Sequence, residues 1–338
     1  MNRYADSRLA GLLRKRRVYV TLELIGLAIL LGALWWALRD VWAEAKPLLR
    51  HADLIDFAIG TAIVAAYYLV FVLGWMRILV AYGIRVPYTV ALQSEMLSML
   101  AKYIPGGVWT PTARVVALRR FGVKDTPVVL ATILLEAGIS AVAGVIVFGV
   151  GLVIIGGADV PLLPVAAFAV VVTFLLYPPV FGSVASRLLR PFGVDEVTPL
   201  PTRTVFELLG FYALTWPLGG AGLFFMLRSV GGDPAVSSIP YLGGVAAVGA
   251  IVAVLAVFAP SGLGVREASM YGLMLAVVSE SVALGATILN RLAITLVEAL
   301  IVLVGFVLLR GSRKPTVAGR EIEGAPVAAL PRDEVLRS

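Results

Sequence analysis

The stretch that decides the fold class is residues 127–155, PVVLATILLEAGISAVAGVIVFGVGLVII, in which the single charged side chain is Glu136. A helix needs about 20 apolar residues to cross the ~30 Å hydrocarbon core of a bilayer, so this run is long enough to span it. Similar apolar runs predict further long helices at about residues 18–38, 54–80, 161–181, 205–227, 240–258 and 282–309.

The composition supports a membrane protein. Hydrophobic residues make up 60% of the 338 residues and charged residues 14%, against roughly half and a quarter in soluble domains. Because one water-soluble core cannot bury so much apolar surface, that surface must face lipid. We therefore predict an all-α, polytopic integral membrane helix bundle of about 7–8 transmembrane helices.

Several classes of function are disfavoured by the residues that are absent or rare. There is no cysteine and one histidine, His51, which excludes thiol chemistry and Cys/His metal sites. The net charge of +7 lies mostly in loops and tails, where basic residues orient helices against anionic headgroups, so we expect no nucleic-acid partner. Without a Gly-x-x-x-x-Gly-Lys loop or a soluble catalytic domain, we expect neither an enzyme nor a cofactor.

The charge pattern also predicts domains and sidedness. We expect a basic cytoplasmic N-terminus at residues 1–17, a transmembrane domain at 18–310 and a polar, disordered cytoplasmic tail at 311–338 of a multi-pass protein of the cell (inner) membrane. Seven crossing helices would place the basic tail outside. We therefore expect either that one irregular segment crosses or that one long helix is broken into two partial passes.

Two irregular segments interrupt the apolar pattern. Residues 102–109, KYIPGGVW, follow a run at 90–104 that is too short and polar for a lipid-facing span, and Arg114 comes next. Residues 259–267, APSGLGVRE, again place Pro and two Gly before a basic residue, and a helix starting near Leu263 would offer its N-terminus to an anion. The alternative interpretation of residues 102–109 is an ordinary cytoplasmic loop. For residues 259–267 it is a tight interhelical turn with an interfacial ion pair.

The two segments stand 155 positions apart, since 260 − 105 = 155. Paired Pro/Gly-interrupted segments in corresponding parts of a chain are typical of transporter binding sites, and they suggest re-entrant segments and an internal repeat.

Charges within long apolar runs add to these segments, because a charge in a helix centre needs a partner or a cavity. Arg291 and Glu298 lie seven residues apart on one predicted helix face. Glu136 can neutralise Arg291 or Arg266, or form a structural interhelical pair. Glu23 and Glu207 lie nearer helix ends and indicate interfacial positions.

Residues 102–109 with Arg114, and residues 259–267, resemble the lysylphosphatidylglycerol synthase transmembrane family, which is also described as flippase-like. Glu136 resembles the family's intramembrane Glu, although Ala137 stands where a basic residue is expected, and Asn290, Arg291 and Gly305 resemble its final helix. The resemblance spans about residues 18–310. It implies the stand-alone translocation module, without the aminoacyl-transferase domain of the two-domain members.

We therefore expect a flippase or scramblase for a phospholipid or polyprenyl-phosphate-linked lipid with an anionic or sugar headgroup. The alternatives are a secondary transporter of a small anion and a non-transporting partner of a lipid-modifying enzyme or glycosyltransferase. The expected partners are membrane lipids, with a homo-oligomer or a lipid-modifying enzyme as protein partners. The predicted headgroup residues are Lys102, Arg114, Arg266, Arg291, Glu136 and Glu267, and the predicted conformational breaks are Pro105, Gly106, Gly107, Pro260, Gly262 and Gly264.

Overall fold

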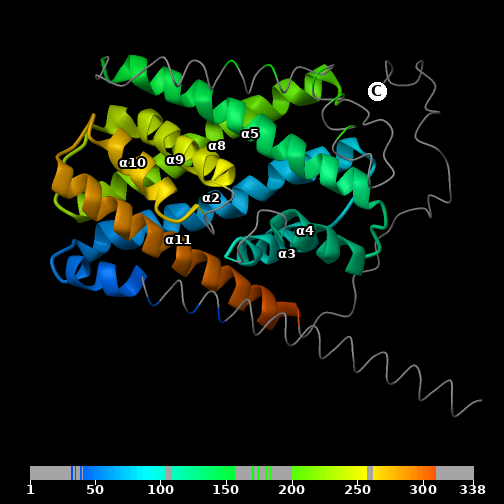
Figure 1. Ribbon diagram of the computed structural model, residues 1–338, viewed down its shortest axis with the longest axis horizontal. Coiled ribbons are helices and arrows are strands. Elements are labelled where there is room, and N and C mark those ends of the chain that lie inside the picture. The colour runs from blue at the N-terminus through cyan, green and yellow to red at the C-terminus, as the bar shows by residue number, and fades with distance from the viewer. Residues whose placement is uncertain are drawn as a thin grey trace, which may run out of the picture.

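The computed structural model describes residues 41–103, 109–156, 200–256 and 262–309, together with a few isolated positions (Figure 1). Within these ranges all regular structure is helical, and residues 41–49 are helical too. The labelled helices are α2 (Leu54–Ala81), α3 (Tyr88–Ala101), α4 (Trp109–Arg120), α5 (Thr126–Ile154), α8 (Thr202–Ser229), the short 3₁₀ helix η2 (Val236–Ser238), α9 (Ile239–Leu255), α10 (Val265–Met274) and α11 (Glu280–Leu309).

The predicted all-helical membrane fold is confirmed. Five described helices are long and apolar enough to cross a bilayer: α2, α5, α8, α9 with η2, and α11 up to Val304. Large apolar side chains also point outward, as at Val153 and Leu214, which are 82% and 80% exposed. The chain is a polytopic helical membrane protein.

The apolar runs predict most helix ends to within a few residues. α2 begins where the Asp53 side chain accepts the Ile55 and Asp56 N–H groups, at 2.8 and 3.1 Å, and Asp125 caps α5 by accepting the Val128 N–H. Such caps satisfy donors that the first turn leaves free. The predicted helices at 18–38 and 161–181, and the segments 1–17 and 311–338, lie essentially outside the described residues.

α2 and α8 run in opposite directions and are joined by an ion pair at each end. Arg77 near the end of α2 pairs with Glu207 near the start of α8 at 3.0 Å. Arg228 near the end of α8 pairs with Asp56 at the start of α2 at 3.2 Å. Glu207 therefore lies at a helix end, as expected.

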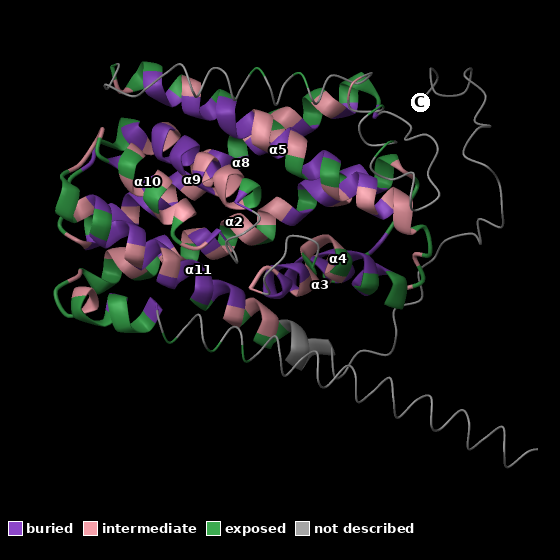
Figure 2. Ribbon diagram, in the orientation of Figure 1, coloured by how far each residue is buried: buried purple, intermediate pink, exposed green. Residues whose placement is uncertain are grey.

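α11 runs parallel to α2, whereas α5 runs antiparallel to α9. The Tyr68 hydroxyl of α2 donates to Glu298 of α11 at 2.9 Å, and Val64, one turn earlier, packs with Ile294. α2 and α11 thus begin at the same end of the bundle. Figure 2 shows that buried residues line the sides of the helices that face one another in the interior.

α9 and α10 form an antiparallel hairpin. The Tyr241 hydroxyl near the start of α9 donates to the Leu273 carbonyl near the end of α10 at 2.7 Å. Near the turn, Gly262 has φ +68° and its Cα faces Ala253 so closely that any side chain would collide. Glycine is the residue that fits such a position.

α3 and α4 form a second antiparallel hairpin. Val90 near the start of α3 packs in one cluster with Leu118 near the end of α4. α3 has 14 residues and α4 has 12, so at about 1.5 Å per residue neither is long enough to cross a ~30 Å hydrocarbon core. In Figure 1 this hairpin lies to the right of the α9–α10 hairpin.

Candidate functional site

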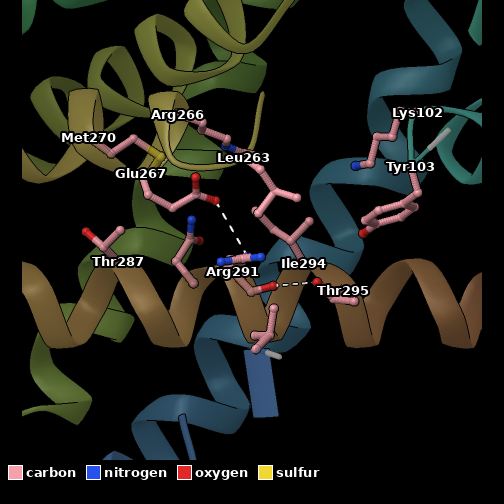
Figure 3. Close-up of a pocket in the computed structure, with 12 residues that line it drawn as sticks. Lys102, Tyr103, Leu263, Arg266, Glu267, Met270, Thr287, Arg291, Ile294 and Thr295 are labelled. Atoms are coloured by element: carbon pink, nitrogen blue, oxygen red, sulfur yellow. Dashed lines mark hydrogen bonds and ion pairs between the residues drawn. The ribbon is translucent and has the colours of Figure 1, made fainter. Parts of the chain in front are cut away.

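A pocket lies where the ends of the two hairpins approach α11 (Figure 3). One hairpin contributes Lys102 and Tyr103, which directly follow α3, and the other contributes Arg266 and Glu267 from the first turn of α10. The full lining is Val41, Lys102, Tyr103, Leu263, Arg266, Glu267, Met270, Thr287, Asn290, Arg291, Ile294 and Thr295.

The start of α10 differs from the expectation of a free helix N-terminus. The helix begins at Val265, and its N-cap Gly264 adopts φ +80°. The Gly264 N–H donates to the Glu267 carboxylate at 2.7 Å. Because Glu267 already satisfies this donor, the helix end offers one donor fewer to an external anion than a fully free N-terminus. No side chain caps the N–H groups of the following turn in the described structure.

Lys102 and Glu298 form a partly buried ion pair beside the pocket. The Glu298 side chain is fully buried, and its two oxygens also accept the hydroxyl protons of Tyr68 and Tyr103, each at 2.9 Å. A carboxylate removed from water needs such donors. Together these contacts tie the segment after α3 to the middle of α11 and α2.

The remaining cations of the pocket are paired weakly or not at all. Arg291 faces Glu267 at 3.8 Å and the half-exposed Glu44 at 3.9 Å, beyond hydrogen-bond distance. Arg266 makes no ion pair within the described part of the chain. Of the three cations, Arg266 is therefore the one without an ion-pair partner in the described part of the chain, and it is the one placed to bind an anionic ligand.

The uncharged polar side chains of the pocket belong to α11. The Thr287 and Thr295 hydroxyls donate to carbonyl groups of their own helix, each at 2.8 Å, and so present only acceptor lone pairs to the pocket. The amide of Asn290 makes no hydrogen bond within the described residues. The free space is about 30 Å³, room for about two water molecules, so a phosphate group requires the pocket to widen.

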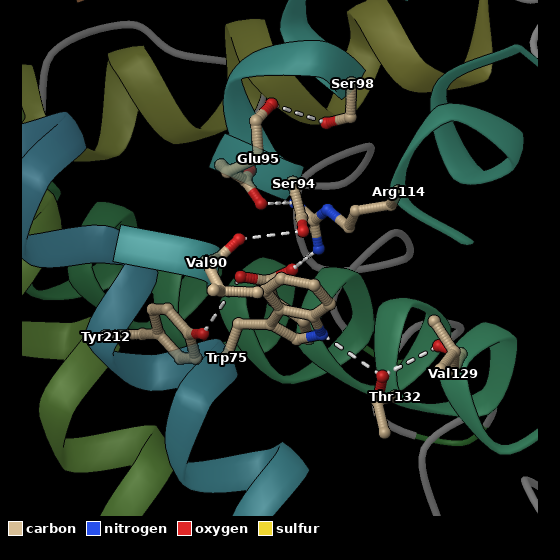
Figure 4. Close-up of polar contacts among 10 residues, drawn as sticks. Trp75, Val90, Ser94, Glu95, Ser98, Arg114, Val129, Thr132 and Tyr212 are labelled. Atoms are coloured by element: carbon tan, nitrogen blue, oxygen red, sulfur yellow. Dashed lines mark hydrogen bonds and ion pairs between the residues drawn. The ribbon is translucent and has the colours of Figure 1, made fainter. Parts of the chain in front are cut away.

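A second charged cluster, the Arg114 triad, consists of Glu95 (α3), Arg114 (α4) and Glu136 (α5) (Figure 4). Both carboxylates contact the guanidinium, and all three side chains are 7% exposed or less. The ring of Trp75 lies 4.4 Å from the guanidinium carbon, a cation–π contact. The Trp75 indole N–H is itself held by Thr132 at 3.1 Å.

The structure separates the predicted headgroup residues into two groups. Lys102, Arg266, Glu267 and Arg291 line the pocket. Arg114 and Glu136 lie together in the triad instead. The predicted pairing of Glu136 with Arg291 or Arg266 is therefore wrong, because Arg114 occupies that carboxylate. Among the predicted breaks, Gly262 and Gly264 have positive φ, whereas Pro105, Gly106, Gly107 and Pro260 lie outside the described residues.

Sequence reasoning left two charged residues out of the site. Glu298 pairs with Lys102, and its place two turns after Arg291 on one helix face was the signal that it points the same way. Glu95 stands among polar residues in the short segment before Lys102, and a carboxylate in such a segment needs a cation nearby. Neither sequence pattern identifies the cation that each carboxylate contacts.

A scan against protein-family models matches residues 24–305 to the lysylphosphatidylglycerol synthase TM region. The match covers both hairpins, the pocket and the Arg114 triad. A comparison with curated proteins gave no match. Since the family match extends over most of the chain and agrees with its helical membrane fold, the chain belongs to the family of lysylphosphatidylglycerol synthase transmembrane regions.

Proposed function

We propose that the chain moves a lipid with a phosphate-bearing headgroup between the two leaflets of the cell membrane. The observation that carries this proposal is the pocket, in which Arg266 lacks an ion-pair partner among the described residues and Arg291 is held only loosely. A phosphate is the natural ligand for arginine side chains that present several donors. Membership of a family named for a lipid synthase supports a lipid substrate.

Headgroup binding requires a rearrangement, since about 30 Å³ of free space holds about two water molecules. In the proposed mechanism the phosphate displaces Glu298 from Lys102 and Glu267 from Arg291. The three cations then bind the phosphate, while the lipid tails stay between helices in the hydrocarbon. The hydroxyls of Thr287 and Thr295 are placed to accept hydrogen bonds from a headgroup that carries donors.

The helix directions support two re-entrant hairpins that enter from opposite faces. One unit consists of α2, the α3–α4 hairpin and α5. The second unit consists of α8, the α9–α10 hairpin and α11. Because α2 and α8 run in opposite directions, the two units have inverted orientations, the arrangement typical of alternating-access transporters. If the α9–α10 hairpin does not cross and the helices predicted from the sequence at 18–38 and 161–181 do, the number of crossing helices is even, and the two termini lie on one side.

The cytoplasmic face is assigned by charge. Arg77, Lys124 and Arg203 lie at the end of the bundle where α2 ends and α5 and α8 begin. At the other end, Arg228 is accompanied by the acidic Asp53, Asp56 and Glu280. The positive-inside rule places the basic end in the cytoplasm. α2 then starts outside, and the N-terminus lies in the cytoplasm if the helix predicted at 18–38 crosses the membrane. We also propose that the chain is a transporter without catalytic activity of its own, with membrane lipids as ligands and a lipid-modifying enzyme or a second copy as protein partner.

The test is reconstitution of the full chain in liposomes that contain fluorescent phosphatidylglycerol or a fluorescent polyprenyl phosphate. Transbilayer movement is followed by a membrane-impermeant quencher. We expect faster movement of one of these probes than in protein-free vesicles, and loss of the increase in Arg266→Gln. The matched control is Arg203→Gln, because Arg203 is 89% exposed and pairs only with Glu207 in the described structure.

Wild-type rates in folded Arg266→Gln would contradict the pocket assignment. If neither lipid moves faster than in protein-free vesicles, the proposed function is wrong. Uptake of a water-soluble anion without lipid movement would then identify the small-anion transporter. Retention of a lipid-modifying enzyme without transport of either kind would identify the non-transporting partner.

A further inference from the structure

The Arg114 triad is a buried charged cluster to which the proposed lipid transport assigns no role. Its three members come from three helices of one unit: Glu95 from α3, Arg114 from α4 and Glu136 from α5. Arg114 Nε is buried and has no hydrogen-bond partner among the described residues. The cluster is therefore not a saturated ion pair of the kind that only joins helices.

The charges of the triad do not balance. Two carboxylates and one guanidinium leave one excess negative charge when all three groups are ionised. No described ion pair joins Glu95 or Glu136 to a cation other than Arg114, and Lys102 is held by Glu298. An uncompensated charge removed from water is costly, and two carboxyl groups that share one site hold a proton between them.

The groups that face the triad from neighbouring helices do not supply the missing charge. From α8 the neutral Tyr212 hydroxyl approaches Glu136 Oε1 at 3.5 Å. From α2 the partly buried side chain of Tyr67 carries no charge, and the ring of Trp75 covers the guanidinium. α9, which packs on α5, contains no charged residue.

We infer that the Arg114 triad is a proton-binding site, in which the two carboxyl groups share one proton at neutral pH. In the binding step a proton from water forms an O–H bond with one carboxylate oxygen, and the other carboxylate stays ionised against Arg114. In the release step that O–H bond breaks, the proton returns to water, and the triad regains its excess negative charge.

α3 connects this proton site to the pocket. Glu95 lies in the middle of α3 and Lys102 caps its end, two helical turns apart. A shift of α3 therefore changes the contact of Glu95 with Arg114 and that of Lys102 with Glu298 together. A row of aromatic rings also leads from Glu136 to Glu298. It begins at Tyr212, next to Glu136, and continues through Phe71 and Tyr67 to Tyr68, which donates to Glu298. The successive ring centroids are 4.9, 5.5 and 5.6 Å apart. Where the proposed transport holds, protonation and pocket opening are then linked.

The test is infrared spectroscopy of the purified full chain in detergent at neutral pH, in H₂O and in D₂O. A protonated carboxyl group gives a C=O stretching band that shifts in D₂O. The wild-type protein is compared with Glu95→Gln and Glu136→Gln, whose amides replace a carboxyl group without its charge. Glu207→Gln is the matched control, because Glu207 is exposed and is paired with Arg77 and Arg203.

We expect the wild-type protein and Glu207→Gln to show the band, and both triad variants to lose it, because one carboxylate then balances one guanidinium. Absence of the band in the wild-type protein overturns the inference, even if a triad variant fails to fold. So does a band that persists in either folded triad variant, or one that disappears in Glu207→Gln. This readout does not depend on lipid transport, so the two proposals can fail separately.

Discussion

Substitution of Arg114 by glutamine tests the triad as a structural element. The guanidinium is the only described ion-pair partner of both Glu95 and Glu136, and its side chain is 7% exposed. Removal of one partner from a buried ion pair costs about 3–5 kcal/mol. One carboxyl group of the triad is protonated in our account, so it loses little electrostatic stabilisation when the guanidinium is removed. We therefore expect a loss near the lower limit, about 3 kcal/mol, which is a large part of a net stability of roughly 5–15 kcal/mol.

The assay is chemical unfolding of the full chain in detergent micelles, followed by circular dichroism. The matched control Arg203→Gln changes an exposed guanidinium, and we expect its effect to stay within about 0.5 kcal/mol. In a double-mutant cycle, Glu136→Gln in the Arg114→Gln background should recover about 1–2 kcal/mol of coupling, since these groups are in contact. A loss in Arg114→Gln below about 1 kcal/mol, or no coupling with Glu136, would refute the reasoning.

Three further predictions concern the pocket, the helix packing and the topology. Glu298→Gln removes the carboxylate that holds Lys102, so we expect the protein to retain phosphatidylglycerol roughly tenfold more tightly, which corresponds to about 1.4 kcal/mol. Retention is measured by mass spectrometry with Glu207→Gln as the control, and equal retention in the two variants would contradict this role of Glu298. Gly243→Ala places a methyl group 2.7 Å from the Trp216 carbonyl oxygen, and overpacking of this kind lowers the free energy of unfolding by about 1–3 kcal/mol. The control is Gly210→Ala, where an added methyl group meets no other atom. An unchanged free energy of unfolding in Gly243→Ala would argue against this packing. Since the chain has no cysteine, a membrane-impermeant maleimide should label Asp233→Cys in intact cells and Lys124→Cys only after permeabilisation; the reverse pattern would invert the proposed orientation.

The helices could be predicted from the sequence because a long apolar run has few alternatives in a bilayer. The start of α5 follows directly from Asp125 and Pro127, a cap and a residue suited to the first turn. The apolar runs do not predict the helix at residues 41–49. That stretch is nine residues long and contains the charged Glu44 and Lys46, so a search for apolar spans does not find it.

The site could be predicted only in part. Lys102, Arg266 and Arg291 were identified because each is a cation close to a Pro/Gly break or inside an apolar run. Their separation from Arg114 was not predictable, since it depends on where α4 packs against α3 and α5. Spacing along one helix places Glu298 on the face of Arg291, but only the packed bundle shows that Lys102 binds it.

The most direct test of the central claim is the lipid phosphate that copurifies with the full chain, measured by mass spectrometry and phosphate analysis. Our account predicts that the wild-type protein and Arg203→Gln retain an anionic phosphate-bearing lipid, and that folded Arg266→Gln loses it. Equal lipid phosphate in all three proteins would contradict a headgroup site at Arg266.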